Sequence, residues 1–79
     1  MNTQLFRIYM VKNNETQKTL AEALNLPQSA VSARINGKTA FRQDEINIIR
    51  KRWNLSDKET VDLFFAEIVS EIDTAEKGA

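Results

Sequence analysis

The chain has 79 residues, of which 42% are hydrophobic and 28% are charged, and its formal net charge is zero. A chain of this length forms at most one domain and buries only about 60% of the surface that its unfolded form exposes, so each apolar side chain matters for stability. The absence of cysteine and histidine excludes disulfide bonds and histidine chemistry, and we see neither a signal peptide nor an apolar run long enough to span a membrane, so we expect a soluble cytoplasmic protein.

The spacing of apolar residues predicts five helices and no strands. The first helix is expected over about residues 3–12, and its inward face is expected to carry Leu5, Ile8 and either Met10 or Val11. The second helix is expected over residues 17–24, with Thr16 as its N-cap, because a threonine hydroxyl accepts a hydrogen bond from a free backbone N–H. Its buried stripe is predicted to consist of Leu20, Ala21 and Leu24.

A short turn separates the second predicted helix from the third. Asn25 suits the left-handed conformation that often ends a helix, and Pro27 suits the first position of the next helix, because its missing N–H is no loss there. The third helix is expected over residues 28–36, with an inward face formed by Val31 and Ile35. Gly37 is expected to end it, and residues 38–42 to form a loop.

The fourth helix is expected over about residues 43–53, and the residues predicted to share its inward face are Ile46, Ile49 and Trp53. Ser56 is expected to cap a fifth helix that begins near Asp57, because acidic residues favour the positive end of a helix. An apolar stripe follows, formed by Val61, Phe64, Phe65, Ile68 and Ile72. We expect one domain over residues 1–74 and a disordered tail over residues 75–79.

The net charge of zero hides an uneven distribution along the chain. Residues 1–53 contain nine basic and four acidic side chains, a net charge of +5, whereas residues 54–79 contain two basic and seven acidic side chains, a net charge of −5. A basic body with an acidic end can hold a polyanion on one side. The alternative is that both sets of charges solvate helix faces, which is how we interpret the basic run Arg50-Lys51-Arg52.

The most informative segment is residues 16–38, TQKTLAEALNLPQSAVSARINGK. It combines a short amphipathic helix, a three-residue turn and a second short amphipathic helix. Ala21 lies where the two helices must approach closely, which requires a small side chain. The side chain of Leu26 can pack into the core and hold the turn against it. Such a pair presents its second helix outward, where it can enter the major groove of DNA, which is about 12 Å wide.

This segment resembles the lambda-repressor-like helix-turn-helix family, which includes phage repressors, Cro-like proteins and related bacterial regulators. The resemblance covers roughly residues 3–65 and is carried by Thr16-Gln17, Leu20-Ala21, Leu26, Gln28-Ser29, Val31-Ser32 and Asn36-Gly37-Lys38. The ending with Phe64-Phe65 resembles the small Cro-type subgroup of temperate phages, and within it the modulators of repression. The resemblance implies an all-α, five-helix DNA-binding domain with the helix-turn-helix at its second and third helices. One departure is that many relatives link the first and third helices by a polar pair, where this chain has Met10 and Ile35.

The resemblance implies two sets of DNA contacts. Phosphate contacts are expected from Gln17, Lys18, Asn36, Lys38 and Arg42, with Arg34 leaning toward a phosphate, because amide and cationic donors suit phosphate oxygens. Base contacts are expected from the outward face of the third helix, formed by Gln28, Ser29, Ser32 and Ala33. Gln28 can pair with adenine, the serines with several bases, and Ala33 with the methyl group of thymine. The alternative for both sets is a solvated surface.

The resemblance also implies a phage transcription regulator in a lysis–lysogeny switch, located in the cytoplasm of a bacterial host. It is expected to bind operator DNA as a homodimer, to bind the partner phage repressor, or both. A partner surface is predicted at Phe65, Ile68, Val69 and Ile72, because exposed apolar stripes mark interaction sites, unless these residues pack back on the domain. The alternative function is a protein–protein interaction module that modulates the repressor with little DNA binding of its own. No catalytic constellation can be assembled, so we expect no enzyme, cofactor, metal, small-molecule substrate or membrane.

Overall fold

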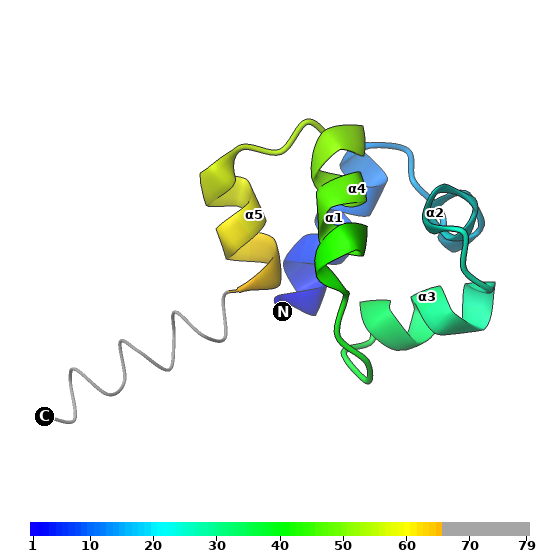
Figure 1. Cartoon of the computed structure of the whole chain (residues 1–79). Helices are drawn as coiled ribbons and strands as arrows, with labels where there is room; N and C mark the ends of the chain where they lie inside the picture. Colours follow the sequence, from blue (N-terminus) through cyan, green and yellow to red (C-terminus); the bar gives the residue numbers. More distant parts are fainter. Residues whose placement is uncertain (66–79) are drawn as a thin grey trace, which may run out of the picture.

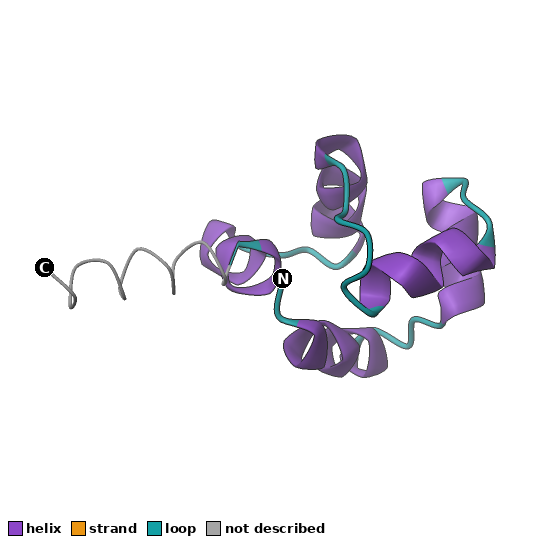
Figure 2. Cartoon of the chain, turned by 90° about the horizontal axis from the view of Figure 1, so that it is seen from below, coloured by secondary structure: helices purple, strands orange, loops and turns teal. Residues whose placement is uncertain are grey.

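A computed structural model describes residues 1–65 of the chain, which form five helices. The helices are α1 (Thr3–Lys12), α2 (Gln17–Leu24), α3 (Gln28–Ile35), α4 (Gln43–Arg52) and α5 (Asp57–Phe64). Helices α2 and α3 lie at one end of the molecule and α5 at the other, with α1 and α4 between them (Figure 1). Residues 1–65 contain no strand (Figure 2), and no helix among them has the length and apolar character needed to cross a membrane.

The five predicted helices are confirmed, and the bounds predicted for the first four and the predicted start of the fifth differ from the observed ones by at most one residue. The expected domain end at residue 74 and the expected tail over residues 75–79 lie outside the described residues.

Local capping interactions explain where several of the helices begin and end. Thr16 caps α2 by accepting a hydrogen bond from the Thr19 N–H at 3.1 Å, and the Ser56 hydroxyl caps α5 in the same way. Asn25 adopts the predicted left-handed conformation, with φ 56° and ψ 46°, after the last residue of α2. Pro27 stands one position earlier than predicted, at the N-cap of α3 rather than inside the helix.

Helix α1 buries a different face from the one predicted. Phe6 and Met10 are buried, Leu5 is half-buried, and Ile8 and Val11 are 59% and 78% exposed. The prediction for Ile8 is therefore wrong, and of the two alternatives Met10 is the inward residue. Because apolar side chains occur on almost every side of this helix, their spacing does not select a face. The large ring of Phe6 gains most from burial and sets the orientation.

The core is centred on the ring of Phe6, which is fully buried. Its centroid lies 5.2 Å from that of Phe41, 5.1 Å from that of Trp53 and 5.9 Å from that of Phe64. These four rings come from α1, the loop before α4, the end of α4 and α5, so the core joins parts that are distant in sequence.

The other predicted core residues of the middle of the chain are confirmed as buried: Leu20, Ala21, Leu24, Val31, Ile35, Ile46, Ile49 and Trp53. In α5 the predicted apolar stripe is only partly confirmed. Phe64 is buried and Phe65 half-buried, but Val61 is 40% exposed and Leu63 is fully buried in its place.

Candidate nucleic-acid interface

Helices α2 and α3 are joined by a three-residue turn, Asn25, Leu26 and Pro27. The left-handed backbone of Asn25 reverses the chain, and the Leu26 N–H then donates to the Ala21 carbonyl at 2.9 Å, which closes the end of α2. Leu26 itself is half-buried and packs against the core, as predicted. The turn is therefore fixed by both hydrogen bonding and packing.

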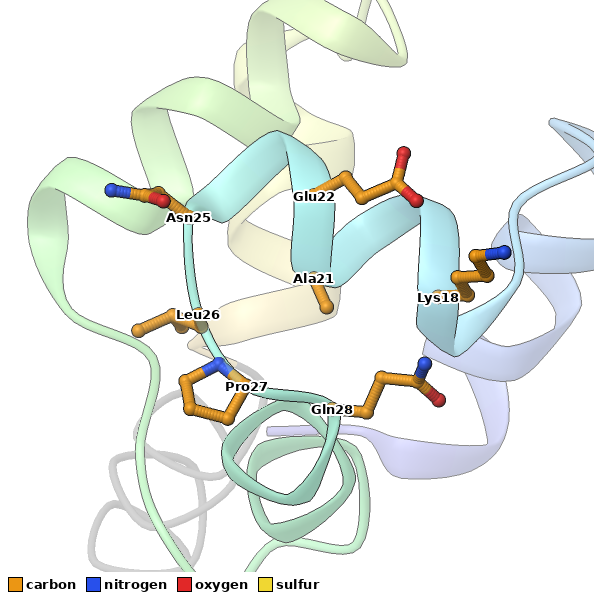
Figure 3. A pocket seen from close by; sticks show the side chains of 7 residues that line it. All are labelled: Lys18, Ala21, Glu22, Asn25, Leu26, Pro27 and Gln28. Carbon is orange, nitrogen blue, oxygen red and sulfur yellow. The ribbon is translucent and has the colours of Figure 1, made fainter.

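Small and branched apolar residues set the approach of the two helices. Ala21 is buried and points from α2 toward α3 (Figure 3), and Val31 on α3 is fully buried. Around this contact lies an open hollow of about 500 Å³. The side chains of Lys18 from α2 and Gln28 from α3 extend on the same side of it (Figure 3). The structure thus brings together one predicted phosphate contact and one predicted base contact from the two helices.

The outward face of α3 is open to solvent. Gln28 and Ser29 are exposed, and Ser32 and Ala33 are half-buried, so none of the four predicted base contacts lies inside the molecule. Pro27 offers no side-chain acceptor to the first N–H groups of α3, and no side chain caps this end of the helix. The start of α3 therefore presents free donors together with the amide of Gln28.

The end of α3 is tied to α1 by a chain of side-chain hydrogen bonds. Arg7 Nη2 donates to Asn36 Oδ1 at 2.5 Å, and Asn36 Nδ2 donates to Ser32 Oγ at 3.3 Å. Gly37 follows with φ 79°, a left-handed value that favours glycine, and the Lys38 N–H donates back to the Ala33 carbonyl at 2.9 Å. This closure ends α3 as predicted and leaves Asn36 and Lys38 exposed.

The remaining predicted phosphate contacts divide into exposed and engaged side chains. Gln17, Lys18 and Arg42 are exposed. The Arg42 guanidinium lies 3.5 Å from the Asp44 carboxylate, but both side chains are about 70% exposed, and such surface pairs contribute little free energy and can exchange partners.

Arg34 does not extend toward solvent. Its side chain is only 12% exposed, and its Nε and Nη2 donate to the two carboxylate oxygens of Glu45, at 2.8 and 3.3 Å. Glu45 is buried and also accepts from the Arg42 N–H at the start of α4, at 2.9 Å. Arg34 therefore connects α3 to α4 instead of leaning toward a phosphate, and we do not retain it as a DNA contact. The capping role of Glu45 at the start of α4 could have been predicted from its position three residues after Arg42. Its ion pair with Arg34 on α3 could not, because the two residues lie on different helices.

A second buried carboxylate, not identified from the sequence, holds the start of α2. The side chain of Glu15, in the loop before α2, is 3% exposed. It accepts hydrogen bonds from Arg52 Nε at 2.6 Å, from Trp53 Nε1 at 2.8 Å and from the Thr19 hydroxyl. Burial by itself would raise the pKa of Glu15, but these hydrogen bonds outweigh it and lower the pKa to about 2. The cluster fixes the α2 end, which carries Gln17 and Lys18, to the end of α4.

The predicted partner surface is described only at Phe65. This residue is half-buried and lines a cavity of about 300 Å³ whose lining includes Phe41, Ile46 and Phe64 as well as the polar side chains of Arg34 and Thr39. Ile68, Val69 and Ile72 lie outside the described residues. The predictions for these three residues therefore stay predictions.

Ion pairs neutralise part of the positive charge of the basic body. Four of the five arginines form ion pairs with carboxylates inside residues 1–65: Arg34 with Glu45, Arg42 with Asp44, Arg50 with Asp57 and Arg52 with Glu15. Arg50, Lys51 and Arg52 are all exposed, in agreement with their interpretation as a solvated face, although the two arginines also form ion pairs. The comparisons with protein-family models, with curated proteins and with solved structures find no match to this chain.

Proposed function

We propose that the chain is a helix-turn-helix regulator of transcription, with the five-helix lambda-repressor-like architecture, that binds double-stranded DNA through α3. The observation that carries the proposal is the open polar face of a short helix whose opposite face is buried in the core. Gln28 and Ser29 are exposed at its start, while Val31 and Ile35 anchor the opposite face in the core. A helix presented in this way fits the major groove.

The chemistry of each side chain determines whether it contacts a base or the phosphate backbone. Gln28 pairs with N6 and N7 of adenine, Ser29 and Ser32 bond to base edges, and the Ala33 methyl group contacts thymine. The backbone contacts come from the two ends of the pair and set register without reading sequence: Gln17, Lys18, Asn36, Lys38 and Arg42. With so few base contacts, one domain reads a short half-site, so we propose that a dimer binds a palindromic operator with half-sites about 34 Å apart.

A test begins with a labelled duplex of mixed sequence, about 20 bp long, titrated by fluorescence anisotropy at several salt concentrations. Three of the proposed phosphate contacts are cationic, so the logarithm of affinity is expected to fall with the logarithm of salt with a slope of about −3 per bound domain. Selection from a randomised duplex library then identifies the operator. Binding that is absent, or that does not weaken with salt, would overturn the proposal.

The base-reading role of α3 is tested by Gln28→Ala on the selected operator. Loss of the bidentate pair is expected to weaken operator binding by about 1–3 kcal/mol and to relax the preference at one base position. Lys58→Gln, a substitution in α5 at the other end of the molecule, is the control and is expected to change neither quantity (Figure 1). An unaltered base preference in Gln28→Ala would show that α3 does not read this position.

A second candidate is a module that modulates a partner phage repressor in a lysis–lysogeny switch, alone or together with DNA. It is favoured by the ion pairing of four of the five arginines, which reduces the number of arginines open to DNA among residues 1–65. A gel shift with the chain, with the candidate repressor and with both distinguishes the two. Absence of a complex with the repressor at micromolar concentrations would argue against this candidate.

A further inference from the structure

Arg7 differs from the other arginines in the way that it is held. It is the one arginine with no carboxylate partner among residues 1–65, where its only hydrogen-bond partner is the neutral amide of Asn36, at 2.5 Å. The residue is exposed. Its positive charge is therefore uncompensated in the described part of the chain, and one of its five N–H donors is used.

The position of Arg7 is defined by the contact of α1 with the end of α3. Asn36 also forms a hydrogen bond within α3 and its cap, because its Nδ2 donates to the Ser32 hydroxyl at 3.3 Å. One turn earlier on α1, Thr3 lies next to Gly37: a Cβ atom added at Gly37 would meet the Thr3 methyl group at 3.6 Å. The first half of α1 thus runs beside Asn36 and Gly37, the residues that end α3. Arg7 is the cation of α1 that lies next to this segment.

We propose that Arg7 is a further phosphate contact of the DNA interface, contributed by α1 and not by the α2–α3 pair. The inference rests on the proposed DNA binding by α3. Asn36 orients the guanidinium beside the end of the helix that enters the groove, where the sugar–phosphate backbone passes. Guanidinium groups bind phosphate through several parallel N–H donors, and Arg7 keeps these donors free. Because Asn36 holds the side chain in advance, less conformational entropy is lost on binding.

The salt dependence of binding to the same mixed-sequence duplex of about 20 bp tests this contact, since phosphate contacts do not depend on base sequence. Loss of one cationic contact in Arg7→Gln is expected to reduce the steepness of the salt dependence by about 0.9. Arg7→Lys keeps the charge and is expected to keep the steepness. Lys58→Gln removes an exposed charge from α5 and is expected to match the wild type. Circular dichroism melts confirm that every variant is folded at the assay temperature.

The outcomes separate this inference from the proposed function. If the wild type shows a salt-dependent affinity and Arg7→Gln has the same slope, Arg7 makes no phosphate contact and only this inference fails. The same conclusion follows if Arg7→Gln melts at a lower temperature but keeps the wild-type slope, because Arg7 is then purely structural. If the wild type itself shows no salt-dependent binding, the proposed function fails and this inference fails with it.

Discussion

Replacing Glu15 with glutamine removes the negative charge toward which Arg52, Trp53 and Thr19 donate, while it keeps the size of the side chain. The hydrogen bonds lower the pKa of Glu15 from 4.5 to about 2 in the folded protein. At about 1.4 kcal/mol per unit of pKa, this difference corresponds to about 3 kcal/mol of folding free energy at neutral pH. Because the carboxylate is buried, solvent does not screen it strongly.

The pH dependence of this contribution has a definite sign. The folded pKa of Glu15 lies below the unfolded one, so its contribution is complete above about pH 4.5 and is lost as the pH falls toward 2. Glu15→Gln has no such group. The difference in stability between the wild type and the variant is therefore expected to be about 3 kcal/mol at pH 7 and to shrink steadily below about pH 4.5.

Urea unfolding followed by circular dichroism measures both quantities. In a thermal melt, a loss of about 3 kcal/mol is expected to lower Tm by more than about 10 °C in a domain of this size. Glu22→Gln, at an exposed position on α2, is the matched control and is expected to stay within about 0.5 kcal/mol of the wild type. A Glu15→Gln variant as stable as the wild type at pH 7, or with the same loss of stability in acid, would refute the reasoning.

Three further substitutions test the fold. Phe6→Ala empties the centre of the core and is expected to cost about 3–5 kcal/mol in urea unfolding; a loss below about 1 kcal/mol would contradict the packing described. Asn25→Ala is expected to lose about 1–2 kcal/mol because its backbone is left-handed, whereas Asn25→Gly is not, and equal stabilities would contradict this assignment. Ala21→Leu is expected to lose about 1–3 kcal/mol by overfilling the α2–α3 contact, and unchanged urea unfolding would show that the contact has room.

The helices and their bounds could be predicted because the signals are local. Thr16 and Ser56 satisfy the first N–H groups of their helices within three residues, and Asn25 reverses the chain at the end of α2. Each of these effects depends on a few neighbouring side chains. The outward position of Gln28 and Ser29 followed from the same local pattern, because Val31 and Ile35 fix the opposite face of α3.

The features that could not be predicted depend on residues distant in sequence. Glu15 meets Trp53 38 positions later, and Tyr9 donates to Glu59 50 positions later, at 2.8 Å. No periodicity encodes such pairs, so Glu15 was counted only among the four acidic side chains of residues 1–53. The inward face of α1 was mistaken for a related reason: the helix is apolar on most sides, and only the surrounding elements select Phe6.

The ring cluster around Phe6 also has a consequence for how the protein is made. Its members stand at positions 6, 41, 53 and 64, so the last ring is synthesised when nearly all of the described chain exists. A nascent chain that ends before Phe64 leaves Phe6 and Phe41 without one of their ring contacts and lacks part of the packing that offsets the loss of chain entropy. Folding is therefore expected to complete only once α5 has left the ribosome, as a single event for α1 to α5.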